Sequence, residues 1–144
     1  MSKFAKDTGE LLAELKSEKN PSDWRKRNRD EFITPLHEFL GKLMMEKNLT
    51  KQEVIERSGL NREYGYHILS GARKNPSRQK ILALALAMGL NLDEVQYLLR
   101  YAQQGVLYPR NQWDAVIISA IEQNLSVVQT NELLHSLGET VLLN

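Results

Sequence analysis

The chain has 144 residues, of which 42% are hydrophobic and 26% are charged, with 19 Lys and Arg against 18 Asp and Glu. These values are typical of a water-soluble globular protein of one or two small domains. The chain contains no Cys, which excludes disulfides, zinc–thiolate sites and thiol catalysis. Residues 1–7 lack the apolar core of a signal peptide, and the longest nearly apolar stretch, residues 81–90, is too short to cross a bilayer. We therefore expect a cytoplasmic protein without a membrane partner.

The near-zero net charge hides an uneven distribution along the chain. Residues 1–34 hold eight basic and seven acidic residues, residues 35–80 hold nine and five, and residues 81–144 hold two and six. Positive charge concentrated in the middle segment is typical of a surface that meets phosphate, although a solvated helical surface is the alternative. The acidic C-terminal region is a candidate surface for a protein partner.

The first 34 residues predict two short helices. An amphipathic pattern runs from about Thr8 to Lys19, and Asn20-Pro21-Ser22 ends it. Ser22 can cap a second helix that contains Trp24 and a basic cluster, residues 25–29. The cluster either reaches the backbone or minor groove of DNA or forms a solvated helix face, and the sequence favours neither. One side of the first helix carries Leu11, Leu12 and Leu15.

Residues 50–71 contain two short helical patterns, about 51–58 and 62–69, separated by a turn. Thr50 is expected to cap the first helix, with Glu53 returning the hydrogen bond in a capping box. Gly59 can take the positive φ that ends this helix, and Asn61 can cap the next one. Two such helices, packed across each other, predict a helix-turn-helix, whose second helix enters the major groove of DNA.

Helical patterns continue on both sides of this motif. We expect one helix over about residues 35–47, another that starts near Pro76 with Asn75 as its cap, and a third over about residues 92–104 that ends at Gly105. After Tyr108-Pro109 the sequence predicts a helical hairpin that turns near Gln123-Asn124. The inward residues of the helix at 35–47 are Leu36, Phe39, Leu40, Leu43 and Met44.

The last third of the chain echoes the preceding hairpin at an offset of 35 residues. This pattern indicates either a duplication or two amphipathic hairpins of similar size. The last hairpin carries more apolar surface than it can bury alone, so it either packs on the domain or forms a dimer interface. The matching positions are Ile81, Leu82, Ala85, Leu92, Leu98, Leu99 and Ala102 with Val116, Ile117, Ala120, Val127, Leu133, Leu134 and Leu137.

From about Pro35 to Tyr101 the sequence resembles the lambda repressor/Cro (Xre) family of DNA-binding domains. The family motifs occur in order: the first helix and turn in residues 50–61, Gly with basic residues and Pro-Ser in residues 71–77, and Met-Gly-Leu-Asn-Leu-Asp-Glu-Val in residues 88–95. The resemblance implies an all-α, lambda repressor-like helix-turn-helix bundle. We assign residues 35–105 to this domain, residues 1–34 to an N-terminal helical extension and residues 106–144 to the added C-terminal helical hairpin.

Two departures from the family pattern fall at one helix crossing. Ile55 replaces a small Ala, and Gly65 replaces a Val or Ile on the facing helix. The two positions normally touch, so the sequence predicts a volume-conserving exchange, with a chance pair of mismatches as the alternative. Gly65 also lowers helix propensity by about 1 kcal/mol relative to Ala.

The resemblance implies a sequence-specific transcriptional regulator that binds double-stranded DNA. Lys51 and Gln52 would meet phosphate, and side chains that open the second helix would reach base edges. Arg62 is suited to guanine and Glu63 to cytosine N4, whereas Tyr66 is alternatively a core residue. Family members usually pair on two half-sites about 34 Å apart, so we expect a homodimer, joined mainly by the C-terminal hairpin or by the N-terminal helix that carries the three leucines. The remaining candidate DNA contacts are Asn61, His67, Arg73 and Lys74.

Enzymatic function has little support in the sequence. The three His residues show no ligand spacing, and no Gly-rich phosphate loop or nucleophile elbow is present. We therefore expect a protein that is not an enzyme and has no metal or cofactor. The alternative is a protein-interaction adaptor that keeps the fold without specific DNA binding, which Gly65, the aromatic pair Tyr64 and Tyr66, and the low net charge favour.

Overall fold

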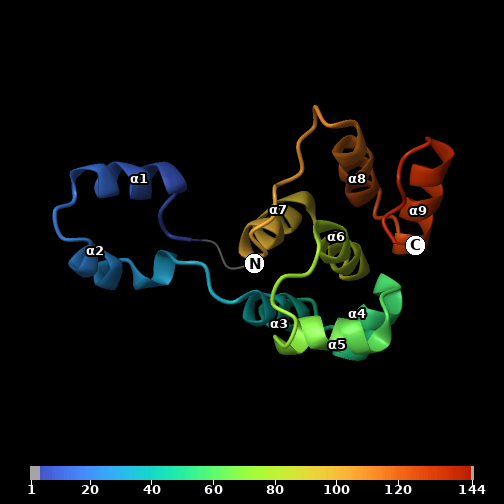
Figure 1. Ribbon diagram of the computed structural model, residues 1–144, viewed down its shortest axis with the longest axis horizontal. Coiled ribbons are helices and arrows are strands. Elements are labelled where there is room, and N and C mark those ends of the chain that lie inside the picture. Colours follow the sequence, from blue (N-terminus) through green and yellow to red (C-terminus); the bar gives the residue numbers. More distant parts are fainter. Residues whose placement is uncertain (1–3, 144) are drawn as a thin grey trace. The chain divides into compact units, whose positions relative to one another are not determined.

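The computed structural model in Figure 1 describes residues 4–143, and these form nine α-helices, one short 3-10 helix and no β-strand. The predicted all-α class is therefore confirmed. The described chain divides into two compact units, residues 4–34 and residues 35–143. None of the described helices combines the length and the apolar character that a membrane span requires.

The N-terminal unit is a helical hairpin: α1 (Thr8–Ser17), α2 (Pro21–Arg27) and the 3-10 helix η1 (Arg29–Glu31). The predicted cap of α2 was wrong. Asn20, not Ser22, accepts the hydrogen bond from the Asp23 backbone N–H, and Pro21 occupies the first turn. Proline fits there because the N–H that it lacks has no partner within the helix.

A polar network surrounds the single buried aromatic side chain of this hairpin. Trp24 is buried, its indole N–H donates to Glu14 at 3.2 Å, and Phe32 packs edge-on against its ring. Lys6 Nζ bonds both Glu14 and the buried Asn28, and its hydrogen bond is the main reason that the pKa of Glu14 is lowered. The leucines of α1 contribute less to the core of the hairpin than their amphipathic pattern suggested, because Leu12 and Leu15 remain exposed.

The second unit opens with α3 (Leu36–Glu46), α4 (Lys51–Ser58) and α5 (Arg62–Ser70). The predicted helix caps and helix end are confirmed: Thr50 caps α4, Gly59 ends it with a φ of 73°, and Asn61 caps α5. The capping box is only half formed, because the Glu53 carboxylate accepts from the Thr50 hydroxyl rather than from its backbone N–H.

Two predicted helix ends were wrong in the next hairpin, α6 (Arg78–Ala87) and α7 (Leu92–Tyr101). Ser77, not Asn75, caps α6, and Pro76 lies buried before the helix, where its carbonyl accepts from Gln104. At the other end, α7 stops before Gly105 because Gln103 already takes a φ of 57°.

The α6–α7 hairpin is the centre of this unit. α4 packs on α6 and α3 packs on α7, where the rings of Phe39 and Tyr101 stack 3.9 Å apart. The last hairpin, α8 (Gln112–Glu122) and α9 (Val127–Ser136), covers the centre with α9 on α6 and α8 on α7 (Figure 1). Because it is enclosed on two sides, the whole segment Ile81–Met88 is buried.

A recurring three-residue turn joins four of the helix pairs. Each turn has a residue with φ between 55° and 73°, then a Leu that is at least partly buried, then the residue that caps the next helix. Positive φ favours Gly and Asn, so the turn is visible in the sequence. The four turns are Asn48-Leu49-Thr50, Gly59-Leu60-Asn61, Gly89-Leu90-Asn91 and Asn124-Leu125-Ser126.

The last hairpin keeps the 35-residue register of α6–α7 in its hydrogen bonds as well as in its helices. Both α7 and α9 begin with a complete capping box, formed by Asn91 with Glu94 and by Ser126 with Gln129. After each of them the chain returns to an amide side chain: Gln96 bonds both backbone groups of Leu107, and Asn131 accepts from the N–H of Leu142. Since caps, turns and amide contacts all share the offset, the structure favours duplication over a chance similarity of size.

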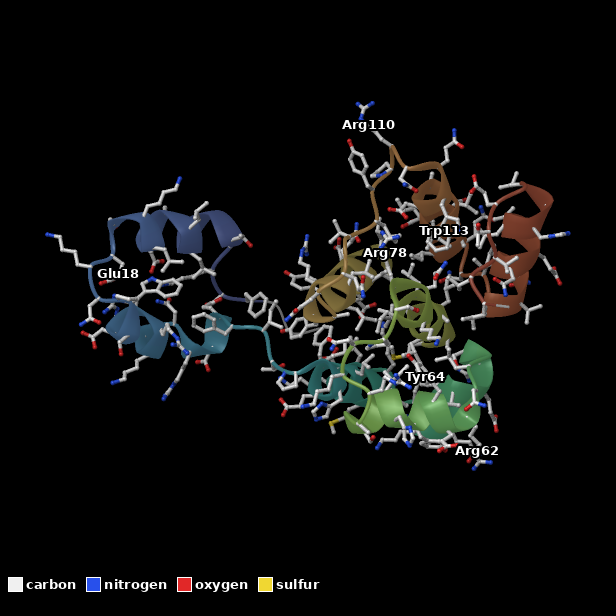
Figure 2. The ribbon with its side chains drawn as sticks, in the orientation of Figure 1. Glu18, Arg62, Tyr64, Arg78, Arg110 and Trp113 are labelled. Carbon is white, nitrogen blue, oxygen red and sulfur yellow. The ribbon has the colours of Figure 1, made fainter. Side chains whose placement is uncertain are left out.

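An ion pair between a partly exposed Arg and a buried Asp joins the start of α8 to the start of α6. Arg78, labelled in Figure 2, donates to both carboxylate oxygens of Asp114, at 2.8 and 2.9 Å, and also to the carbonyls of Gly105 and Val106. Burial by itself raises the pKa of Asp114. The hydrogen bonds from Arg78 and from the Tyr108 N–H outweigh this effect, so the pKa lies below its usual value.

Candidate nucleic-acid interface

The predicted base-reading residues lie together along α5, from its N-cap to its last turn. An open surface depression is lined there by five of them: Asn61, Arg62, Glu63, Tyr66 and His67. The Asn61 side chain is used locally, because it accepts from the Tyr64 N–H at 3.1 Å. Arg62, Glu63 and His67 are exposed, and Arg62 projects away from the ribbon (Figure 2). We call this depression the α5 surface.

Tyr66 links the α5 surface to α4. Its ring is half-buried and also lines an adjoining depression with Gln52 and Glu56. The Arg62 guanidinium lies 5.8 Å from the centre of the Tyr66 ring, near the outer limit of a cation–π contact. Arg62 is therefore held only weakly and remains able to reach another partner.

The two residues predicted at the start of α4 differ in their surroundings. Gln52 lies beside Arg62 and Tyr66 in the adjoining depression, where its amide donates to Glu56 at 3.1 Å. Lys51 is exposed as the first residue of α4 and lines neither depression. Of these two residues, Gln52 shares a depression with Arg62 and Tyr66 of the α5 surface, and Lys51 does not.

Basic side chains in and after the loop that follows α5 lie against a tyrosine of α5. The Arg73 guanidinium lies 4.7 Å from the ring centre of Tyr64, and Lys80 Nζ lies 3.9 Å from the same centre. The Arg73 N–H also donates to the carbonyl of His67 at 2.9 Å. Sequence reasoning missed Lys80 and the role of Tyr64 as the platform for both cations. The exposed Lys74 follows Arg73, and neither lines the α5 surface.

The predicted contact between Ile55 and Gly65 is present. A Cβ atom added to Gly65 would lie 3.1 Å from Cγ1 and 3.2 Å from Cγ2 of Ile55. Both residues are buried. The absence of a side chain at Gly65 therefore allows α4 and α5 to approach closely, and this contact positions the α5 surface.

In the N-terminal unit, the structure separates the basic cluster into two groups. Arg27 pairs with Glu18 at 2.7 Å, and the pKa of Glu18 is lowered first by a hydrogen bond from the Asn20 backbone and then by Arg27. The other three cations, Arg25, Lys26 and Arg29, line one open depression with Ser22 and the exposed ring of Phe32. We call this depression the N-terminal basic surface.

The one buried Glu side chain of the described residues, Glu94, has structural partners. Glu94 is buried, completes the cap of α7 and pairs with Lys47 at 3.0 Å. Within residues 4–143, no group of three or more His, Asp or Glu side chains is placed to hold a metal ion. Comparisons with protein-family models, curated proteins and solved structures found no match.

Proposed function

We propose that the chain is a sequence-specific, DNA-binding transcriptional regulator of the helix-turn-helix type, with a lambda repressor-like fold in residues 35–105. The observation that carries the proposal is the α5 surface. Arg62 and Glu63 are exposed at the start of a helix that packs on α4, and His67 is exposed in its last turn. A guanidinium, a carboxylate and an imidazole on the surface of one helix supply the donors and acceptors that distinguish base pairs in the major groove.

Phosphate contacts would come from cations around this surface. Lys51 at the start of α4 and Arg73 and Lys74 after the end of α5 are exposed, and the described chain offers none of them an ion-pair partner. Such contacts position a protein on the duplex without reading its sequence. The N-terminal basic surface would add three further cations, because Arg25, Lys26 and Arg29 likewise lack carboxylate partners in the described chain.

The test begins with the selection of ligands from a pool of random duplexes at low salt. We expect a defined sequence to be enriched, and its affinity to fall steeply from about 50 to 200 mM salt, since Lys and Arg displace condensed counterions. Failure to enrich any sequence, or an affinity that does not depend on salt, would contradict the proposal and favour the protein-interaction adaptor.

A further inference from the structure

The N-terminal basic surface combines positive charge with an exposed aromatic ring. Its cations are Arg25, Lys26 and Arg29, and the ring is that of Phe32, which is 43% exposed. Phosphate contacts with a DNA duplex would use the cations alone. Because the ring lines the same depression as the cations, one ligand can contact both.

The three cations of this surface have no carboxylate partner among residues 4–143. Arg27, which lies between them in the sequence, instead pairs with Glu18 at 2.7 Å and does not line the depression. The surface is therefore a cluster of like charges whose mutual repulsion an anionic ligand would relieve.

The Phe32 ring is held by the core of the hairpin. It packs against Trp24, which is buried and whose indole N–H donates to Glu14 at 3.2 Å. The two rings meet at 90°, with their centres 5.8 Å apart. A T-shaped contact uses at most one face of the Phe32 ring, so at least one face stays free of Trp24. The surface thus presents an aromatic ring in a fixed place beside three cations.

A ligand that matches both parts of this surface carries phosphates and flat rings, as nucleic acid does. Inside a duplex, neighbouring base pairs cover both faces of each base, so only an unpaired base can stack on Phe32. An open depression suits a strand that passes across it better than a free nucleotide, because small-molecule sites enclose most of their ligand. A membrane matches less well, because the exposed leucines of α1, Leu12 and Leu15, do not line the depression.

We propose that the N-terminal basic surface binds single-stranded nucleic acid, with one base stacked on Phe32 and neighbouring phosphates on Arg25, Lys26 and Arg29. A basic surface with an aromatic platform is the arrangement by which proteins bind single strands without reading their sequence. The site lies within residues 4–34, in a different unit from the α5 surface. It therefore adds a second class of nucleic-acid ligand and does not depend on the proposed duplex contact.

The experiment measures the fluorescence anisotropy of a labelled thymidine oligonucleotide, titrated with the full chain at low salt and with no duplex present. Phe32→Leu keeps an apolar side chain but removes the aromatic face, and Phe32→Trp restores a larger one. We expect the Kd to rise about 5- to 100-fold for Phe32→Leu, and to stay at or below the parent value for Phe32→Trp. A strand of abasic sites should bind the parent protein about as weakly as the oligonucleotide binds Phe32→Leu. A uridine oligonucleotide, titrated in the same way, identifies whether DNA or RNA is the preferred strand.

The phosphate contacts and the location of the site have their own controls. Replacement of Arg25, Lys26 and Arg29 by Gln should reduce the slope of log affinity for the single strand against log salt by about 2, at about 0.7 per contact. Arg27→Gln is the matched control for charge, because Arg27 already has a carboxylate partner. Arg62→Ala should leave single-strand affinity unchanged, since Arg62 lies on the α5 surface. Circular dichroism would verify that each variant keeps the helical content of the parent protein.

Several results would overturn the single-strand proposal. The parent protein could fail to bind the oligonucleotide at low salt. The abasic strand could bind as tightly as the oligonucleotide, or Phe32→Leu could bind like the parent, so that only charge is recognised. Arg62→Ala could weaken binding as much as the triple variant does, which would place the strand on the α5 surface.

Vesicles of phosphatidylserine and phosphatidylcholine distinguish a membrane from a strand. Tighter binding to these vesicles than to the oligonucleotide, lost in the triple variant, would make the surface a membrane contact and overturn the proposal. Because no duplex is present in any of these measurements, each result leaves the proposed DNA-binding function of the α5 surface to its own test.

Discussion

At the scale of single residues, the contact between Ile55 and Gly65 shows how the side chain at one position restricts which residue fits at another. Gly65 has an ordinary helical conformation, so its backbone does not require glycine. The space that a Cβ would need is taken by the Ile55 side chain, at 3.1 Å. Glycine at this position therefore serves packing between helices, which offsets its low helix propensity.

This contact predicts a strongly coupled pair of substitutions. Gly65→Val overpacks the contact and Ile55→Ala leaves a cavity, and each should lower the free energy of unfolding by about 1–3 kcal/mol. The double variant should recover much of the loss, as measured by urea denaturation in a double-mutant cycle. Strictly additive losses would contradict the contact. Gly41→Ala is the control: a Cβ there meets no atom within 4 Å, so this change should stabilise by about 0.5–1 kcal/mol.

Arg62 and Arg57 provide a matched pair for the proposed DNA contact. Arg62 lines the α5 surface, whereas Arg57 lies in α4 outside both depressions, 3.5 Å from Glu53. Arg62→Ala should lower affinity for a selected duplex by about 1–3 kcal/mol and relax the preference at one base pair. Arg57→Ala should leave that preference unchanged. Unaltered affinity and preference in the Arg62 variant would remove this residue from base recognition.

At the scale of helices, the Arg78–Asp114 pair decides how the duplicated hairpin is attached. It joins the first residue of α6 to the start of α8 and holds the connecting chain through its carbonyl contacts. The side chain of Asp114 is buried, so its charge depends on Arg78 and the Tyr108 N–H for compensation. The last hairpin is therefore held on α6–α7 by an ion pair as well as by apolar packing.

Asp114→Asn should lower the free energy of unfolding by about 1.5–3 kcal/mol at neutral pH, because charge-assisted hydrogen bonds are lost. The pKa of Asp114 is lowered in the folded state, so its contribution is fully present above the unfolded value of about 3.9 and disappears as pH falls through the folded value. The difference between parent and variant should therefore shrink in acid, as measured by urea unfolding across pH. A difference that stays constant to low pH would contradict this role; Glu122→Gln, an exposed change in α8, is the control.

At the scale of the whole molecule, the N-terminal basic surface belongs to a unit separate from the one that carries α5. If it contacts phosphate, replacement of Arg25, Lys26 and Arg29 by Gln should reduce the slope of log affinity against log salt by about 0.9 per lost contact. The change should be the same for all duplexes, since phosphate carries no sequence information. Arg27→Gln is the control, because Arg27 already pairs with Glu18. An unchanged slope in the triple variant would leave this surface as a solvated helix face.

Much of the helical framework could be predicted because its signals are local. A capping side chain, a residue with positive φ and an apolar period of 3.6 act within one or two turns, so Thr50, Gly59 and Asn61 ended or began helices where the sequence indicated. Predictions failed where two local choices competed. Asn20 rather than Ser22 caps α2, and Ser77 rather than Asn75 caps α6, where Pro76 is held by a side chain 28 residues away.

The chain by itself determined the all-α class, most helix ends, the 35-residue echo and the neighbouring positions of the residues on the α5 surface. Only the tertiary structure decided which charged side chains are paired, because partners such as Glu18 for Arg27 and Tyr64 for Arg73 lie in a different element or loop and not one helical turn away. It also decided that the last hairpin packs on α6–α7. The apolar pattern of a helix indicates how much of its surface must be buried. Which other element buries that surface depends on contacts between distant segments, and local helix preferences do not specify those contacts.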